Sequence, residues 1–125
     1  MPGLSIHVVD VSRGLVAIGM KIEVYAVVDQ GGADPDRAER HHVAAGITSQ
    51  AGQLDVPHVA SALRSGVFDV VFHVADYYRK AGVTLPAVPF LDVVTYRFGV
   101  TDSALHTHLP FKCTPWGYSC FRGGA

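Results

Sequence analysis

The chain has 125 residues, which is enough for one compact domain and too few for two of ordinary size. Hydrophobic residues make up 49% of it, charged residues only 17%, and the net charge is −1. This balance gives no basic surface for nucleic acid or anionic membrane, and favours a small near-neutral molecule or another protein as the partner. So little charge in so small a chain predicts that partner subunits cover part of its apolar surface.

Alternating apolar and polar residues predict β-strands along most of the chain. The expected strands, in chain order, are residues 4–10, 20–28, 67–74, 90–98, 107–112 and 118–122. Ser12-Arg-Gly14 and residues 51–53 predict turns, and the polar residues 29–37 predict a long loop. Many short strands favour an all-β fold, as an antiparallel sandwich or barrel, with residues 1–125 forming a single domain.

One stretch departs from this alternation. Val74-Ala-Asp-Tyr-Tyr-Arg-Lys-Ala81 lacks a period of two and precedes Gly82, which predicts a short helix at about residues 75–81 with a glycine cap. Just before it, Asp69 and His73 are expected to face outward as a surface pair. No apolar run reaches the ~18–20 residues of a membrane-spanning helix, so no membrane association is expected.

The two cysteines, Cys113 and Cys120, form no recognisable disulfide framework. Met1-Pro-Gly-Leu4 leads into a strand-like segment and does not have the pattern of a secretory signal. We therefore interpret both thiols as reduced and structural, and expect a cytoplasmic protein.

The last nineteen residues before Ala125 carry most of the chemical information. His106 and His108 are two apart, which places both on one face of an extended strand. A Pro115-Trp-Gly-Tyr118 turn then leads to Arg122, so a β-turn can bring imidazoles and a guanidinium together around a planar, polar heterocycle. The chain has no metal-spaced histidine and cysteine cluster and no phosphate-binding glycine loop, so neither a metal nor a cofactor is expected.

These motifs resemble, in the same order, those of the 5-hydroxyisourate hydrolases, the transthyretin-like enzymes of purine breakdown. The matching segments are Leu4–Gly14, Phe68–Arg79, Pro89–Val100 and His106–Gly124. The resemblance implies a β-sandwich of the transthyretin type with one short helix. It also implies a homotetramer, built as a dimer of dimers, with the active sites at the dimer–dimer interface.

The resemblance assigns two catalytic histidines. His7, which alternates away from Ile6 and Val8, matches the first active-site histidine of the family. His108 matches the second, and His106 is then peripheral. In the family, the two imidazoles move protons without a metal while water opens the substrate ring.

The substrate-binding residues implied by the resemblance include three departures from the family. Arg122 and Gly123 keep the arginine and glycine of the closing Tyr-Arg-Gly-Ser, but Phe121 and Gly124 replace its tyrosine and serine. Gln53 stands where the family has an arginine after an Asp-Gly turn. All three changes remove polar or cationic groups from the expected pocket.

Three functions follow from this pattern. The first is metal-free hydrolysis of 5-hydroxyisourate. The departures allow a second, in which a diverged enzyme acts on another small heterocycle, such as a lactam, imine or spirocyclic intermediate. A third is a non-catalytic carrier of small molecules, against which the retained His7, His108 and Arg122 argue.

Overall fold

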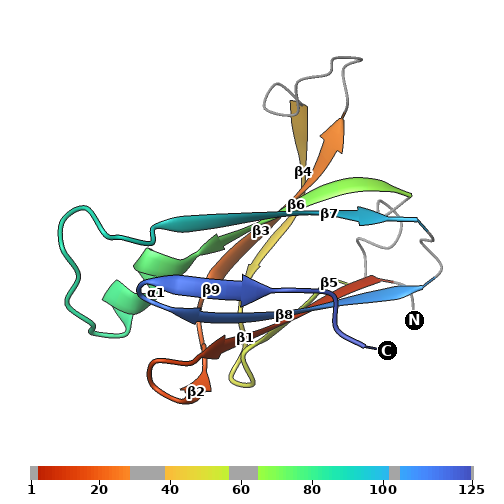
Figure 1. Cartoon of the computed structure of the whole chain (residues 1–125). Coiled ribbons are helices and arrows are strands. Elements are labelled where there is room, and N and C mark those ends of the chain that lie inside the picture. The colour runs from red at the N-terminus through yellow and green to blue at the C-terminus, as the bar shows by residue number, and fades with distance from the viewer. Residues whose placement is uncertain (1–2, 29–38, 57–64, 102–104, 125) are drawn as a thin grey trace.

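The computed structural model describes residues 3–28, 39–56, 65–101 and 105–124, which form two β-sheets and one short helix (Figure 1). The first sheet contains β1 (Gly3–Asp10), β2 (Leu15–Val16), β5 (Gln53–Val56), β8 (His106–Thr114) and β9 (Gly117–Cys120). The second contains β3 (Lys21–Val28), β4 (Glu39–Ile47), β6 (Gly66–His73) and β7 (Val93–Val100). The helix α1 spans Val74–Lys80.

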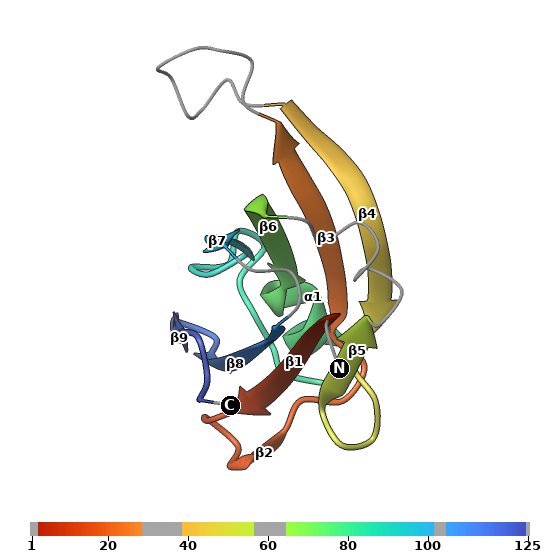
Figure 2. The ribbon, with the colours of Figure 1, turned by 90° about the vertical axis from the view of Figure 1, so that its right-hand side faces the viewer.

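The predicted antiparallel sandwich is confirmed, with one parallel pair of strands. The first sheet runs β2-β1-β8-β9 with β5 also paired to β1, and the second runs β4-β3-β6-β7. Every pair is antiparallel except β1 with β8, which join segments from opposite ends of the chain. Figure 2 shows the two sheets as facing layers, with the edge strands β7 and β9 on the same side.

The core lies between the two sheets and consists of the inward residues of alternating strands. On β1, Ile6 and Val8 are fully buried, as the alternation predicts. The rings of Phe72 on β6 and Phe111 on β8 stack across the interface with centroids 3.8 Å apart. These contacts fix the distance between the sheets and leave the opposite face of β1, with His7, turned outward.

Helix α1 begins directly after β6 and ends just before the glycine that the sequence indicates as its cap. Gly82 has φ +88°, a conformation that a side chain disfavours, and its N–H donates to the carbonyl of Arg79. The glycine cap is therefore confirmed, and the helix lies one residue earlier than predicted. In the described ranges, no helix has both the length and the apolar character needed to cross a membrane.

Three strands escaped prediction, and two others have different bounds. The strand expected at 90–98 is β7, which begins only at Val93 and runs to Val100. β4, β5 and β2 were not expected, because β4 opens with charged and histidine residues and the other two are very short. The strand expected at 118–122 ends at Cys120, so Phe121 and Arg122 lie in an extended tail. The loop predicted at 29–37 lies outside the described residues.

The prediction that Asp69 and His73 form a surface pair is wrong. Asp69 is only 1% exposed, because the Arg97 guanidinium covers it with hydrogen bonds of 2.8 and 3.0 Å. His73 instead contacts Glu23, with 2.6 Å between Nε2 and Oε1. Both residues do turn away from the core, but each has a partner on a neighbouring strand.

Candidate functional site

The candidate site lies on the outer face of the first sheet, where β1 runs between β5 and β8. In this register His7 stands opposite Gln53 on β5 and opposite Pro110 on β8. Ser5, two residues earlier, stands opposite His108. Residues opposite each other in a ladder share a face, so His7 and His108 are diagonal neighbours on adjacent strands.

Ser5 links the two histidines of β8. Its Oγ lies 2.7 Å from Nε2 of His106 and 2.7 Å from Nδ1 of His108. The two imidazoles therefore share one face of β8, as their spacing predicts. The signal for Ser5 was present in the sequence, since alternation puts it on the same face as His7, but its partner strand could not be read from local pattern.

The C-terminal tail crosses β8 at His108. The N–H of Gly123 donates to the carbonyl of His108 at 2.8 Å. A Cβ at position 123 would lie 2.8 Å from Cδ2 of His108 and 3.3 Å from the ring of Pro110. Only a glycine lets the tail pass this close, so the imidazole of His108 is bounded by Ser5 on one flank and by the tail on the other.

A cavity of about 500 Å³ opens beside these residues. Its walls are formed by Ser5, Leu105, His106, His108, Arg122, Gly123 and Gly124. Four of the predicted site residues are thus brought together: His108, Arg122, Gly123 and Gly124. His7 and Gln53 lie on the same sheet face but do not line this cavity.

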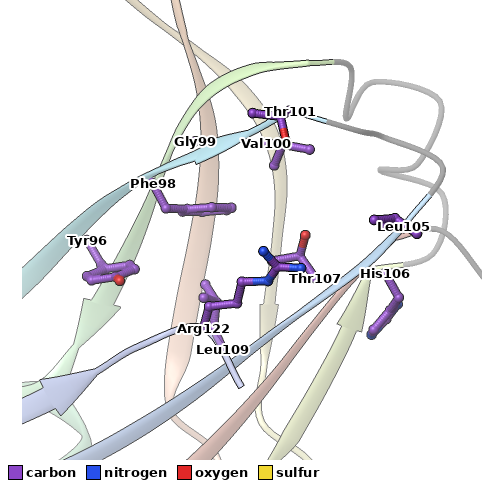
Figure 3. Close-up of a pocket in the computed structure, with 10 residues that line it drawn as sticks. All are labelled: Tyr96, Phe98, Gly99, Val100, Thr101, Leu105, His106, Thr107, Leu109 and Arg122. Atoms are coloured by element: carbon purple, nitrogen blue, oxygen red, sulfur yellow. The ribbon is translucent and has the colours of Figure 1, made fainter. Parts of the chain in front are cut away.

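Arg122 also lines a smaller cavity of about 110 Å³ between β7 and β8. Figure 3 shows its side chain reaching between the two strands near Thr107 and Phe98, whereas His106 points away from it. Phe121 lines neither cavity; its ring is 45% exposed and lies 5.9 Å from the Lys112 ammonium. The arginine therefore borders both spaces, and the phenylalanine predicted for substrate binding lies outside them.

Gln53 is held in place by the turn that precedes it. The Ser49 N–H donates to the Gln53 carbonyl at 2.9 Å, and the Gly52 carbonyl accepts from Val8 of β1 at 2.8 Å. Gly52 has φ +71°, and a Cβ there would meet Val8 O and Val16 at 2.8 Å. The predicted turn lies one residue earlier than expected, and Gln53 begins β5 directly opposite His7.

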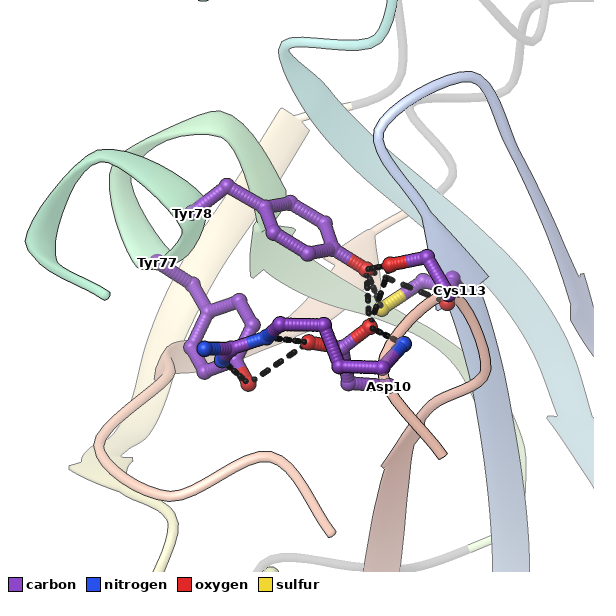
Figure 4. Close-up of polar contacts among 6 residues, drawn as sticks. Asp10, Tyr77, Tyr78 and Cys113 are labelled. Carbon is purple, nitrogen blue, oxygen red and sulfur yellow. Dashed lines mark hydrogen bonds and ion pairs between the residues drawn. The ribbon is translucent and has the colours of Figure 1, made fainter. Parts of the chain in front are cut away.

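A second polar cluster, at the far end of β1, is a structural one (Figure 4). Asp10 is fully buried and accepts hydrogen bonds from Ser12, Arg13, Tyr77 and Tyr78 at 2.7 to 3.1 Å. Burial alone would raise the pKa of Asp10, but the hydrogen bonds from Arg13, Ser12 and the two tyrosines outweigh it and hold the pKa below its usual value. The cluster joins the β1–β2 turn to α1 and leaves no carboxylate oxygen for a ligand.

The described residues contain no group of three histidine, cysteine, aspartate or glutamate side chains arranged to hold a metal ion. The chemistry that the site offers is that of imidazoles, a hydroxyl and a guanidinium around an open cavity. Such groups can move protons and hold the polar edge of a planar ligand.

The fold and these residues define a two-sheet protein with a histidine-rich site on one outer face, and comparison with known proteins identifies its family. The family model described as HIUase/Transthyretin matches residues 4–123. The chain therefore belongs to the HIUase/transthyretin family. A protein of Deinococcus radiodurans named 5-hydroxyisourate hydrolase is 39% identical over 98% of this chain and 96% of its own length.

Solved structures agree with the fold. The 5-hydroxyisourate hydrolase of Klebsiella pneumoniae superposes with a TM-score of 0.73 at 23% identity, over 99% of this chain and all of that one. Sea bream transthyretin, solved with thyroxine, gives a TM-score of 0.79 at 21% identity, over 98% of this chain and 96% of that one. The transthyretin type of sandwich predicted from sequence is confirmed.

Proposed function

We propose that this protein is a 5-hydroxyisourate hydrolase, which opens the six-membered ring of its substrate by adding water at the lactam carbonyl. The observation that carries the proposal is the sheet face on which His7 and His108 lie on adjacent strands, beside a cavity lined by Arg122. Relatives of nearly the same length bear this name at 38–39% identity. The reaction belongs to purine breakdown.

In this reaction the histidines carry the protons and Arg122 binds the ring. One imidazole takes a proton from the attacking water, and the other either steers the substrate or returns a proton to the departing ring nitrogen. Imidazole suits both steps because its ordinary pKa of about 6.5 lies near working pH. We assign the first step to Nε2 of His108, because Ser5 already occupies Nδ1. Arg122 can make paired hydrogen bonds to the imide edge.

Replacement of His108 by alanine tests this assignment. We expect turnover to fall by about 10²–10⁴-fold, the usual contribution of a general acid or base. The assay follows the ultraviolet decay of freshly made 5-hydroxyisourate, with the spontaneous rate subtracted. His41→Ala, at an imidazole that is 60% exposed on the other sheet, is the matched control. A His108→Ala protein with undiminished turnover would contradict the assignment.

A second candidate function is favoured by the position of Gln53. It lies directly opposite His7, so the exchange of the family's arginine for glutamine removes a positive charge from the face that carries the histidines. Together with Gly124 at the cavity wall, this makes the site less polar and less cationic. An enzyme for another, less anionic heterocycle would fit such a site.

The variant Gln53→Arg separates the two candidates. Loss of one electrostatic stabiliser commonly costs on the order of 10²–10³ in turnover. If 5-hydroxyisourate is the substrate, the unaltered protein accelerates its decay, and we expect Gln53→Arg to raise kcat/KM by roughly tenfold. The second candidate would be favoured by two results together: the unaltered protein leaves 5-hydroxyisourate to decay at its background rate, and Gln53→Arg accelerates that decay.

We further propose that the active form is a homotetramer, a dimer of dimers with its sites at the dimer–dimer interface. Large apolar side chains exposed in the isolated chain support it. They are Val11, Leu15, Ile18, Val28, Ile47, Val67, Val88, Phe90, Val93, Leu105, Trp116, Tyr118 and Phe121. A partner that covered many of these would complete the walls of a site that lies open on an outer sheet face.

A further inference from the structure

The hydroxyl of Ser5 stands between two ring nitrogens in the middle of the candidate site. Ser5 lies on β1, which pairs with β5 on one side and with β8 on the other. Its Oγ is 2.7 Å from both His106 Nε2 and His108 Nδ1, which is hydrogen-bonding distance for each. The catalytic scheme above uses neither Ser5 nor His106.

The protons of this group of three cannot be placed independently. A serine hydroxyl has one proton to donate and lone pairs to accept, and a neutral imidazole has one N–H and one bare nitrogen. The hydroxyl cannot donate to both rings at once, so at least one ring nitrogen must carry a proton and donate to Ser5. When Ser5 donates to a bare Nε2 of His106, Nδ1 of His108 must therefore carry the proton that completes the second hydrogen bond.

We propose that His106, Ser5 and His108 form a proton relay, in which Ser5 passes protons between the two rings and His106 stores the charge that His108 collects. The inference rests on the proposed function, because it gives His108 the role of base. It adds Ser5 and His106 to the working residues of the same site, Ser5 as a positioning and relay residue.

The relay balances proton by proton. At the start His108 carries its proton on Nδ1, which donates to Ser5, and the Ser5 hydroxyl donates to Nε2 of His106. When water attacks the carbonyl, its O–H bond breaks and an N–H bond forms at Nε2 of His108. The Nδ1 proton then moves to Ser5 Oγ as the Ser5 proton moves to His106. His108 is neutral again, with its proton on Nε2, and His106 is a cation.

The second half of the reaction reverses these transfers. Nε2 of His108 donates its proton to the departing ring nitrogen. Ser5 returns a proton to Nδ1 of His108 and takes one from Nε2 of His106, which becomes neutral. His108 can thus serve as base and then as acid at the same atom, which leaves His7 to steer the substrate. No net proton is gained or lost by the protein.

The packing around His108 allows this exchange without rotation of the ring. Ser5 holds Nδ1, and Gly123 closes the Cδ2 flank so tightly that a Cβ there would lie 2.8 Å away. A ring held on both flanks keeps Nε2 in one place while its protonation alternates. Because the ring cannot turn, a proton taken up at Nε2 can be balanced only by release of the proton on Nδ1 to Ser5.

Three charged or titratable groups face the relay from the neighbouring elements. Asp55 on β5 is the cross-strand partner of Ser5 on the side away from His108. His7 lies two residues along β1, and Arg122 borders the same cavity from the tail. A pH profile of the enzyme therefore reports the relay together with these three groups.

A double-mutant cycle tests the relay. Ser5→Ala and His106→Ala are each expected to lower kcat by roughly tenfold with KM little changed, and the double variant is expected to lose no more than either alone. Ser119→Ala, at an exposed serine on β9 of the same sheet, is the matched control and should keep full turnover. Unchanged kcat in either single variant, or a double loss equal to the product of the single losses, would overturn the relay.

A second measurement does not depend on the substrate. Ring-nitrogen NMR of the unliganded protein should show that protonation of His106 changes the Nδ1 signal of His108, and that Ser5→Ala abolishes this response. Independent titration of the two rings in the unaltered protein would overturn the relay even if the enzyme is active. Coupled rings in a protein that leaves 5-hydroxyisourate untouched would instead keep the relay and refute the proposed substrate.

Discussion

At Gly123 the C-terminal tail passes so near His108 that the size of a single residue controls the geometry of the site. Alanine at this position would bring a carbon to 2.8 Å from Cδ2 of the imidazole and 3.3 Å from Pro110. Because Ser5 holds the other flank of the ring, His108 can yield only by leaving its hydrogen bond or by moving the tail.

We therefore expect Gly123→Ala to lower kcat by about 10²-fold, the usual effect of displacing a reacting group by about 1 Å. Steady-state kinetics at saturating substrate measure this loss. Gly124→Ala is the matched comparison, since nothing lies within 4 Å of a Cβ there and the ring of His108 should keep its position. Equal kcat values for Gly123→Ala and the unaltered protein would show that the tail does not restrain the ring.

Single residues were predicted well where alternation and motif agreed. His7 was placed on the outer face because Ile6 and Val8 point inward, and the structure has it there. Ser5 was missed because its importance comes from β8, a strand paired in parallel from the other end of the chain. Alternation predicts the outward direction of Asp69, but it does not reveal the arginine on the neighbouring strand that covers it.

At the scale of whole elements, Asp10 joins the end of β1 to helix α1, and this junction makes stability depend on pH. The folded state holds the pKa of Asp10 below the usual value of 3.8, through the hydrogen bonds from Arg13, Ser12 and the tyrosines. A carboxyl whose pKa falls on folding contributes stability that is complete above its unfolded pKa. That contribution is lost as the pH falls through about 4 toward the folded value.

Replacement of Asp10 by asparagine should reveal this contribution. At pH 7 we expect the free energy of unfolding to fall by on the order of 2–3 kcal/mol, because the charge-assisted hydrogen bonds are lost. At pH 3 the difference between variant and unaltered protein should shrink, since the unfolded carboxyl takes up a proton there while the hydrogen bonds keep the folded carboxyl ionised. Urea unfolding at both pH values measures it.

Asp76→Asn on helix α1 is the control for this experiment. Asp76 pairs with Lys80 at the surface, where both side chains are at least half exposed. Such a pair contributes little, so its loss should change stability by less than about 1 kcal/mol at either pH. A constant difference between Asp10→Asn and the unaltered protein from pH 7 to pH 3 would refute the linkage.

Strands and the helix were predictable where apolar and polar residues alternate regularly or a glycine marks the end of the element. β1, β3 and β6 alternate cleanly and α1 ends at a glycine, so each was found to within about a residue. β4 and β5 are edge elements whose conformation comes from their neighbours. β4 pairs with β3 through a register shift at Val24 and Tyr25, and β5 has only four residues. Pairing with neighbouring strands determines the conformation of such segments, and the local sequence pattern does not reveal that pairing.

At the scale of the whole molecule, the edge strand β7 begins beside an unusually exposed apolar loop. Val88 is 85% and Phe90 82% exposed, although both are large hydrophobic residues. β7 and β9 are edge strands on the same side of the sandwich (Figure 2), and the backbone groups of an edge strand can pair with a strand of a second copy. We infer that this side forms the contact between two chains within a dimer.

Phe90→Ser should therefore weaken assembly. We expect the unaltered protein to sediment at four times the chain mass of 13.4 kDa, and the variant to shift toward smaller species at micromolar concentration. Ile47→Ser is the matched control, since Ile47 is 65% exposed but lies on β4, at the opposite edge of the same sheet. A shift in Ile47→Ser equal to that in Phe90→Ser would place the contact elsewhere.

The two thiols provide reporters of local opening that need no engineering. Cys113 lies buried against Tyr78 in the core, and Cys120 lies in the edge strand β9. Burial raises the pKa of Cys113 to about 11 and that of Cys120 to about 12, so alkylating reagents at neutral pH meet almost no thiolate in the closed fold. The rate of labelling at Cys120 therefore reports how often β9 detaches from its sheet. The rate of labelling at Cys113 reports how often the two sheets separate.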